Sequence, residues 1–327
     1  MTVARSDSLG WSETEGVLGR GGVMRLPLVS IVIPAYNGSR YLRESVQSVL
    51  NQDYANTELL VLDDGSTDNT RDILHSYTNQ FYWESHANMG QASTLNKGWR
   101  KAKGEILSYL SVDDTLEPHA VRVAVDHLVR YPEVVLVYGD FALMDAESHT
   151  FRHVRTPDFH YLDMVANFVC QPGPGVFFRR EAFDRVGGWN SSLRQTPDYE
   201  YWLRLGLRGT FLHLPQPLAR FRVHEHSLSY AERSVESAEE CVRVMGEYFQ
   251  RDDLPAEVRA VERQAYASAH LIAARAHLCA GRYQYMATQI RQAWQWRARS
   301  VLSVRAYRLL GNGLRFRVRR RLRPRSV

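Results

Sequence analysis

Runs of apolar residues alternate with amphipathic stripes along the first half of the chain. The run VSIVIP, which ends at Pro34, is continuous in the way that a parallel strand buried on both faces requires. Apolar residues at helical spacing follow it, from Leu42 to Leu50. The alternation repeats with the runs ELLVLD, FYWES, ILSYLS and VVLVY. Strands that alternate with helices need right-handed crossovers, so the pattern predicts an α/β fold with a mostly parallel sheet and flanking helices.

The pattern loosens after Asp140, where it predicts a short strand at GVFFR, a helix over residues 198–207 and a strand over residues 217–224. The last third of the chain is predicted to be helical and is rich in arginine and alanine. The sequence thus divides into a disordered extension, an α/β domain, a separate helical region and a basic tail, over residues 1–24, 25–230, 231–310 and 311–327. Met24 directly precedes the first strand, so either Met1 or Met24 could be the natural start.

The bulk composition is typical of a globular protein, with 44% hydrophobic and 24% charged residues among 327. No stretch approaches the ~20 apolar residues of a membrane span, and the N-terminus has no apolar core of the signal-peptide type. The cysteines Cys170, Cys241 and Cys279 lie far apart without a CxxC pair, which argues against a zinc site or a disulfide framework. These features predict a cytoplasmic protein.

The net charge of +5 is concentrated at the C-terminus. Eight arginines and no acidic residue lie between Arg308 and the end of the chain, and subtracting them from +5 leaves −3 on the remainder. Three interpretations of this tail stay open: an anionic membrane surface, nucleic acid, or a solvated tail without a partner. We favour the membrane, with the protein peripheral on its inner face. Nucleic acid is not expected, because no recognition motif accompanies the charge.

Polar motifs follow three of the predicted strands. PAYN begins at Pro34, DDGSTD begins at Asp63, and VDDT contains Asp113 and Asp114. Ligands bind outside the carboxyl ends of the strands in an open parallel sheet, so we expect these motifs to meet there. The second and third motifs also have a structural interpretation. Asp-Gly-Ser often forms turns and N-caps, and the aspartate pair could cap a helix. No Gly-rich phosphate loop is present, so a diphosphate would need a metal, and paired carboxylates can hold Mg²⁺ or Mn²⁺.

These motifs occur together with FFRREAFDRVGGWN, TPDYEYWLRL and ARFRVHEHSLS further along the chain. In this order they resemble the family 2 glycosyltransferases of the GT-A fold, a Rossmann-like fold, over roughly residues 28–230. The resemblance is to inverting enzymes that build bacterial cell-surface glycans. It implies a nucleotide-sugar donor, expected to be UDP-linked, a divalent metal (Mn²⁺ or Mg²⁺) and a hydroxyl acceptor on a lipid-linked or cell-surface glycan.

The resemblance also implies roles for individual residues. Asp64 would accept a hydrogen bond from the base, Asp114 would be the principal metal ligand, and Asp198 would be the general base. His224 would complete the metal or diphosphate site, with His226, two residues away, as the alternative. The remaining implied positions line the donor (Pro34, Ala35, Tyr36, Asn37, Asp63, Asn96 and Asp113) or shape the acceptor side (Gly187, Gly188 and Trp189).

Two positions depart from the family pattern. Ser111 stands where many members have a third aspartate, and Pro197 stands where many have a glutamate, but the carboxylates expected to act are retained. Transfer would be a single displacement, with Asp198 taking the acceptor proton and the metal acting as a Lewis acid. Trp189 is the aromatic residue that we expect to stack on a sugar ring.

Other classes of protein remain as alternatives. The chain could be a catalytically silent, sugar- or nucleotide-binding relative that acts as a partner subunit. A nucleotidyltransferase is less favoured, because PAYNGSRY lacks a Gly-rich loop bearing arginine and lysine. A processive synthase is disfavoured by the lack of both a QxxRW motif and membrane spans. The C-terminal helices could make a homodimer.

Overall fold

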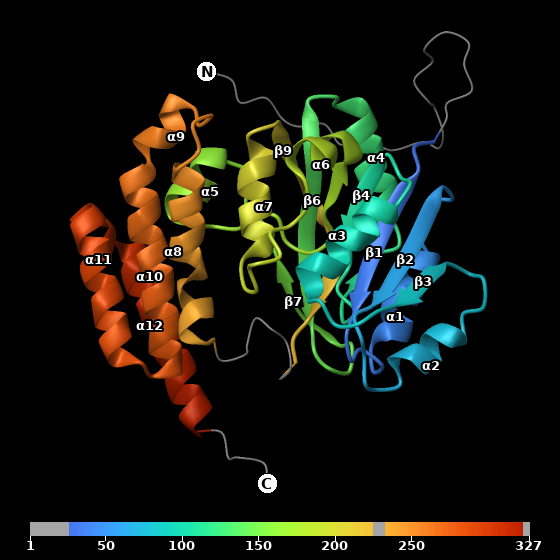
Figure 1. Ribbon diagram of the computed structural model, residues 1–327, viewed down its shortest axis with the longest axis horizontal. Helices are drawn as coiled ribbons and strands as arrows, with labels where there is room; N and C mark the ends of the chain where they lie inside the picture. Colours follow the sequence, from blue (N-terminus) through green and yellow to red (C-terminus); the bar gives the residue numbers. More distant parts are fainter. Residues whose placement is uncertain (1–25, 225–232, 323–327) are drawn as a thin grey trace, which may run out of the picture.

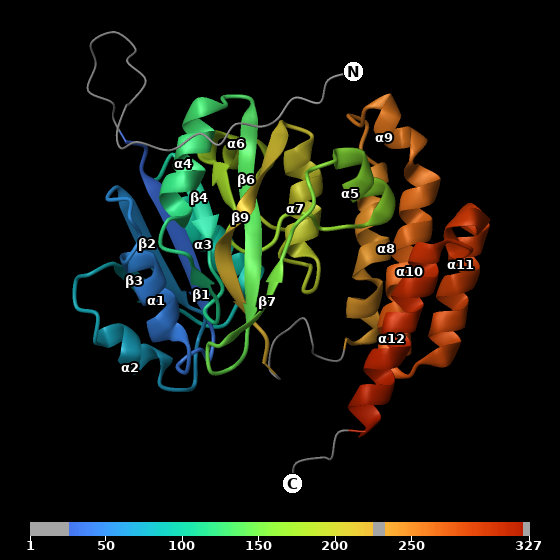
Figure 2. The ribbon, with the colours of Figure 1, turned by 180° about the vertical axis from the view of Figure 1, so that it is seen from behind.

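The computed structural model describes residues 26–224 and 233–322, with side chains up to residue 318. The predicted N-terminal extension and His226 lie outside this part of the chain. The described residues form one sheet between layers of helices, with the C-terminal helices packed beside them (Figures 1 and 2). The strands are β1 (Val29–Ala35), β2 (Thr57–Asp63), β3 (Tyr82–Ser85), β4 (Ile106–Tyr109), β5 (Thr115–Leu116), β6 (Val134–Met144), β7 (Thr150–Val154), β8 (Phe177–Arg179) and β9 (Thr210–Arg222).

The predicted α/β class is confirmed, and the sheet is mixed. Its order is β3-β2-β1-β4-β8-β6-β9-β5, with β7 paired to β6. The pairs β3–β2, β2–β1 and β1–β4 are parallel, and so is the pair β6–β9. By contrast, β8 is antiparallel to both of its neighbours. Apolar runs predict where strands occur but not which strands pair, and the insertion of β8 between β4 and β6 makes the sheet less parallel than predicted.

The helices occupy both faces of the sheet. They are α1 (Leu42–Leu50), α2 (Thr70–His75), α3 (Gln91–Lys101), α4 (Ala120–Arg130), α5 (Tyr161–Asn167), α6 (Arg180–Val186), α7 (Pro197–Gly206), α8 (Val235–Phe249), α9 (Ala256–Ala260), α10 (Glu262–Ala280), α11 (Tyr283–Val301) and α12 (Val304–Leu322). Alternation along β1 explains the two cores: Ile31 and Ile33 pack with α1 and α4, whereas Val32 packs with α3. The sheet is therefore buried on both faces.

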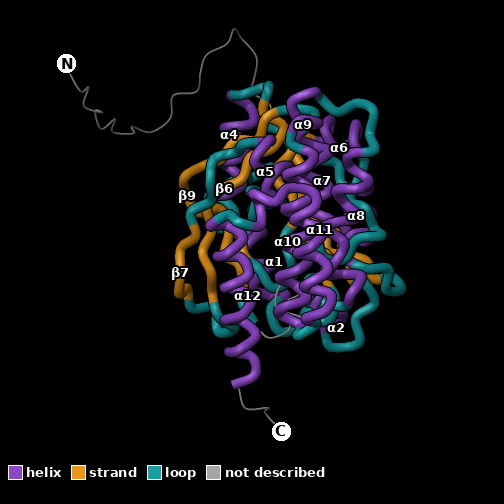
Figure 3. The backbone as a smooth tube through the Cα atoms, turned by 90° about the vertical axis from the view of Figure 1, so that its left-hand side faces the viewer, coloured by secondary structure: helices purple, strands orange, loops and turns teal. Residues whose placement is uncertain are grey.

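The C-terminal helices form a layer beside the sheet (Figure 3). Their core is continuous with that of the α/β part, because Met164, Phe168 and Tyr199 cluster with Tyr248 and Ala269. The helical region that we predicted to be separate thus shares a hydrophobic core with the rest. α12 also continues to Leu322, past the predicted boundary at residue 310, since leucine and arginine favour helices. No helix in the described residues is long and apolar enough to cross a membrane.

Candidate active site

The motifs that follow β1 and β2 lie side by side, because Ala35 and Asp63 are paired in the parallel register. Asp63 is fully buried; its Oδ1 accepts a hydrogen bond from the Ser66 amide at 3.1 Å and its Oδ2 from the Ser85 hydroxyl at 2.5 Å. Asp63 therefore shapes the turn and ties it to β3. Pro34 and Ala35 are buried at the end of β1, so they support the turn that follows this strand.

Asp64 accepts two hydrogen bonds from the loop before α3. The Met89 amide donates to Oδ1 at 2.7 Å and the Gly90 amide donates to Oδ2 at 3.0 Å. Asp64 is only 3% exposed, and His86 Nδ1 lies 3.6 Å from its Oδ1, so Oδ2 is the oxygen with a second lone pair that faces no other side chain among the described residues. The loop holds the carboxylate in one orientation.

The turn after β1 exposes an aromatic ring. Tyr36 is 52% exposed, although aromatic side chains are usually covered. Asn37 beside it has a left-handed backbone (φ 49°), which asparagine tolerates better than most residues. The Thr67 amide donates to Asn37 Oδ1 at 2.8 Å, and the Asn37 amide donates to Ser66 Oγ at 2.9 Å. These bonds lock the two turns together and present Tyr36 at the strand ends.

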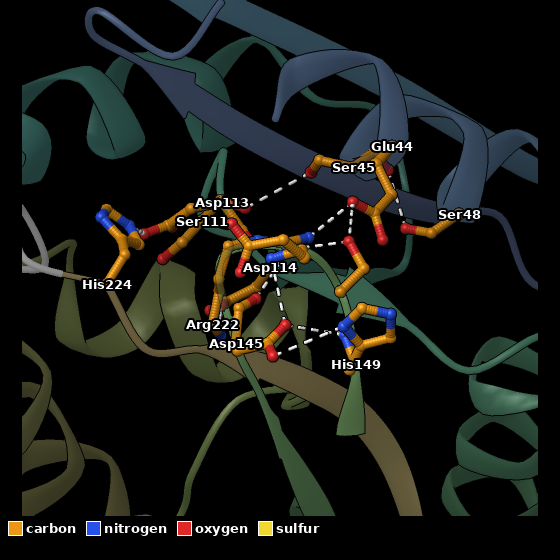
Figure 4. A network of polar contacts seen from close by, with 12 residues as sticks. Glu44, Ser45, Ser48, Ser111, Asp113, Asp114, Asp145, His149, Arg222 and His224 are labelled. Atoms are coloured by element: carbon orange, nitrogen blue, oxygen red, sulfur yellow. Dashed lines mark hydrogen bonds and ion pairs between the residues drawn. The ribbon is translucent and has the colours of Figure 1, made fainter. Parts of the chain in front are cut away.

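Asp113 and Asp114 follow β4 at the same edge (Figure 4). Asp113 Oδ2 lies 2.9 Å from His224 Nε2, so the segment that follows β9 lies against the aspartate pair. Asp114 is buried, and its Oδ1 accepts the Arg222 amide at 2.8 Å. Burial, and then the neighbouring Asp113 carboxylate, raise the pKa of Asp114 well above its usual range, while Arg222 opposes the rise. The structure thus brings together the three residues predicted near the metal and the diphosphate.

Arg222 is a residue that the sequence analysis missed. It is only 1% exposed, and its guanidinium carbon lies 4.4 Å from the centre of the Tyr41 ring. Its nitrogens donate to four oxygens: Asp113 O (2.8 Å), Asp145 O (3.1 Å), Ser148 Oγ (2.8 Å) and Glu44 Oε2 (2.6 Å). In an extended chain, residues two positions apart point to the same side, so Arg222 and His224 of the RVH motif lie on one side. This pattern could have identified Arg222 from the sequence.

Asp198 lies in the first turn of α7. Its Oδ1 accepts the Tyr199 amide at 2.8 Å, and the Cys170 thiol donates to its Oδ2 at 3.9 Å. Burial raises the pKa of Asp198 above its ordinary value, although these hydrogen bonds oppose the rise. The pKa of Tyr109 is raised by burial and then by the charges of Asp198, Cys170 and Asp114.

The predicted acceptor loop is fixed to α3 by one side-chain amide. Asn96 Nδ2 donates to the Trp189 carbonyl at 2.7 Å, and the Trp189 amide donates to Asn96 Oδ1 at 2.7 Å. A Cβ on Gly188 would lie 2.1 Å from Asn96 Oδ1, so only glycine permits this approach. Gly187, with φ 76°, ends α6 in a conformation that favours glycine. Asn96 was expected to border the donor, and here both of its polar groups hold the loop.

Trp189 is also less open than predicted. It is 5% exposed, and its ring packs edge-on against Trp99 and Tyr109, with centroids 5.8 and 5.0 Å away. A ring covered in this way does not offer a free face to a sugar. Its indole N–H has no hydrogen-bond partner among the residues that the structure describes.

The ligands for a metal are only partly present. Asp113 and His224 supply a carboxylate oxygen and an imidazole nitrogen, which are donor types that Mn²⁺ accepts. Within residues 26–224 and 233–322, no group of three His, Cys, Asp or Glu side chains is arranged to hold a metal ion. The two donors fit such an ion as part of a larger ligand set.

Comparison with known proteins identifies the family. Residues 30–187 match the family model for glycosyl transferase family 2. An uncharacterized glycosyltransferase of Rickettsia typhi is 34% identical over 208 residues, which are 61% of this chain and 65% of that protein. Chondroitin synthase of Escherichia coli is 33% identical over 194 residues, covering 58% of this chain and 28% of the synthase. The chain thus spans less than two thirds of the length of these relatives.

Solved structures show the same fold. Residues 1–349 of Staphylococcus aureus TarS, in complex with UDP-GlcNAc, superpose with a TM-score of 0.66 at 17% identity, covering 90% of this chain and 91% of TarS 1–349. A mannosyltransferase of Pyrobaculum calidifontis, in complex with GDP-Man and Mn²⁺, gives a TM-score of 0.57 at 18% identity, covering 90% and 81%. The chain has the GT-A fold, and its residues 30–187 match glycosyltransferase family 2.

Proposed function

We propose that this protein is an inverting glycosyltransferase that moves a sugar from a UDP-linked donor to a hydroxyl group of a glycan or lipid-linked acceptor. The observation that carries the proposal is the presence of two separate carboxylate sites, Asp113–Asp114 in the turn after β4 and Asp198 in the first turn of α7. One site is suited to the departing diphosphate and the other to the acceptor proton. Separate sites are what a single displacement at the anomeric carbon requires.

The turns after β1 and β2 supply the donor side. Asp64 Oδ2 has a lone pair available for the N–H of a base such as uracil, and the exposed ring of Tyr36 offers a face on which the base can stack. The UDP-GlcNAc complex of TarS, which shares the fold, supports a uridine nucleotide.

Asp113 and His224 would hold a divalent ion, Mn²⁺ or Mg²⁺, together with oxygens of the diphosphate. The proposal gives Asp113 the direct contact because it already lies 2.9 Å from His224, whereas Asp114 accepts the Arg222 amide and stabilises the turn. When bound, the ion supplies Lewis-acid stabilisation of the charge that develops on the leaving group. The mannosyltransferase with the same fold was solved with Mn²⁺.

Asp198 would be the general base. The acceptor oxygen forms a bond to the anomeric carbon as the bond from that carbon to the diphosphate breaks, and the hydroxyl proton passes to Asp198. Burial raises the pKa of Asp198, which strengthens it as a proton acceptor, and its bonds to the Tyr199 amide and the Cys170 thiol fix its orientation. A catalytically silent relative would not need this half-buried carboxylate, whose presence favours the enzyme.

The test is the thermal unfolding midpoint with UDP, GDP, dTDP or CMP, each with and without Mn²⁺. A ligand that binds only the folded protein raises the midpoint, and we expect UDP with Mn²⁺ to raise it most. Asp113→Asn should abolish the dependence on Mn²⁺, whereas the matched variant Asp126→Asn, remote on α4, should retain it. No shift with any of the four nucleotides would contradict the proposal.

A further inference from the structure

We propose that α12 binds the surface of an anionic lipid bilayer. The feature that points to it is a row of exposed apolar side chains, which we call the α12 stripe: Val304, Tyr307, Leu314 and Val318. Their exposed fractions are 67%, 80%, 52% and 47%. At about 100° per residue they lie within an arc of about 80° on one side of the helix. A soluble protein rarely exposes four large apolar side chains in a row to solvent.

The stripe is not the side by which α12 packs onto the protein. The packed side includes Ala306, which is almost fully buried, and Gly313, where a Cβ would lie 3.1 Å from Arg275 and 3.3 Å from Leu278 of α10. Figures 2 and 3 show α12 lying on α10 at the surface of the helical layer. α12 is therefore apolar on two sides, and only one of them is covered by the described residues.

Charge indicates which partner fits the uncovered side. The sequence from Arg263 to the C-terminus contains fifteen arginines and no aspartate, glutamate or lysine. Because the whole chain has a net charge of +5, the preceding residues carry −10. Arg308 and Arg315 lie beside the stripe at about 80–100° from Tyr307 and are exposed. The apolar row is thus bordered by positive charge on a helix without a negative one.

This combination matches a bilayer surface that carries anionic headgroups. Arginines bind the headgroup phosphates, while tyrosine and aliphatic side chains enter the boundary between headgroups and acyl chains. A nucleic acid would use the arginines but leave Val304, Leu314 and Val318 in water. No described helix is apolar enough to span the bilayer, so the contact would be interfacial.

The position of α12 suits the proposed reaction, on which this step rests. In Figure 1 β1 begins at the top of the molecule, and the C-terminal end of α12 lies at the bottom, where β1 ends. α12 runs roughly from top to bottom in this view, so a bilayer bound along it would lie beside the helical layer, with only the C-terminal end of α12 level with the strand-end motifs.

The test is sedimentation of the full chain with vesicles, without nucleotide. We expect binding to vesicles of phosphatidylcholine with one quarter phosphatidylglycerol, and little binding to phosphatidylcholine alone. Arg308→Gln with Arg315→Gln should weaken binding about 30-fold, and raised salt should weaken it too. Tyr307→Ser with Leu314→Ser and Val318→Ser should weaken it at least about tenfold.

Matched variants on other surfaces provide the controls. Phe151→Ser with Val129→Ser removes equally exposed apolar side chains, and Arg152→Gln with Arg155→Gln removes two exposed arginines. Both controls should bind vesicles like the wild type. The proposal is overturned if the stripe variant binds normally, if neutral vesicles bind equally well, or if the stripe instead mediates a dimer in the absence of lipid. Vesicle binding needs no nucleotide, so it can succeed or fail independently of the proposed activity.

Discussion

Asp198 is a carboxylate subject to opposing effects. Burial disfavours its charge and raises its pKa, while the Tyr199 amide and the Cys170 thiol favour the charge and lower the pKa. Burial prevails. A carboxyl whose pKa is higher in the folded than in the unfolded state binds its proton more tightly when folded, so it reduces stability as pH rises between the two values. The feature that makes Asp198 a better base therefore costs the fold stability at neutral pH.

We expect Asp198→Asn to lower the rate of sugar transfer by about 10²–10⁴-fold, the usual contribution of a general base. The same variant should unfold at a higher temperature than the wild type at pH 7, because an amide has no charge to bury. In the wild type, transfer should decline as pH falls through the raised pKa of Asp198. Transfer rates from pH 4 to pH 8, and thermal unfolding at pH 7, would check these outcomes.

The control for this prediction is Asp184→Asn, which makes the same chemical change at an exposed position on α6. It should leave both transfer and stability unchanged. If Asp198→Asn kept full activity, another residue would have to be the base, and Cys170 would be the first to examine because of its contact with Asp198.

Side chains at the strand ends could be predicted from the sequence, whereas their supporting contacts could not. Asp63, Asp64 and Asp113 were identified because parallel strands end at one edge, a rule that needs no coordinates. The bonds of Asn96 to Trp189 join residues 93 positions apart, and no local pattern encodes such a pair. The buried ring of Trp189 was missed for the same reason, because burial depends on distant neighbours.

At the scale of elements, Arg222 joins four segments near the aspartate pair. It lies at the end of β9 and donates to the turn after β4, to α1, and to two positions of the β6–β7 turn (Figure 4). Buried guanidinium groups persist only where several acceptors surround them. Arg222 therefore fixes the aspartate pair relative to the neighbouring elements.

We expect Arg222→Met to reduce the free energy of unfolding by about 2–5 kcal/mol, because it leaves the partly buried Asp113 and Asp145 carbonyls and the Glu44 carboxylate without this donor. The comparison is Arg220→Met on the same strand. Its guanidinium is 43% exposed and pairs with Glu117, so its loss should change stability by less than about 1 kcal/mol. Urea unfolding of the three proteins measures the difference, and equal losses would refute a special role for Arg222.

The elements themselves were largely predictable, and their pairing was not. β1 and β2 follow from periodicity, because the strands with which they pair all lie within the first 110 residues. β8 is three residues long and lies between β4 and β6, an arrangement set by contacts that span more than 40 residues. β5 has two residues and no periodicity to detect.

At the scale of the whole molecule, Glu240 connects the helical layer to the proposed base. Glu240 lies on α8 and is buried, and its carboxylate accepts the Arg194 amide at 2.9 Å and the Gln195 amide at 2.6 Å. These amides belong to the loop that leads into α7 and Asp198. The C-terminal helices thus help to hold the catalytic side of the α/β part.

We expect Glu240→Ala to lower the turnover rate about tenfold through misplacement of Asp198, and to reduce the free energy of unfolding by about 1–3 kcal/mol. The UDP-dependent shift in unfolding temperature should be retained, because the donor side is untouched. Glu247→Ala, exposed on the same helix and paired only at 4.0 Å with Arg243, is the control and should match the wild type. A parallel loss of UDP binding in Glu240→Ala would indicate general disruption instead.

The shared core of sheet and helices has a consequence for synthesis on the ribosome. Met164, Phe168 and Tyr199 belong to the first two thirds of the chain, yet their cluster includes Tyr248 and Ala269, which are translated later. At about 5–20 residues per second, the 74 residues between the end of α7 and the end of α10 take roughly 4–15 seconds to add. Throughout that interval the nascent α/β part lacks the helices that cover this apolar face. The proposed active site therefore becomes native only after the helical layer has emerged to cover that face.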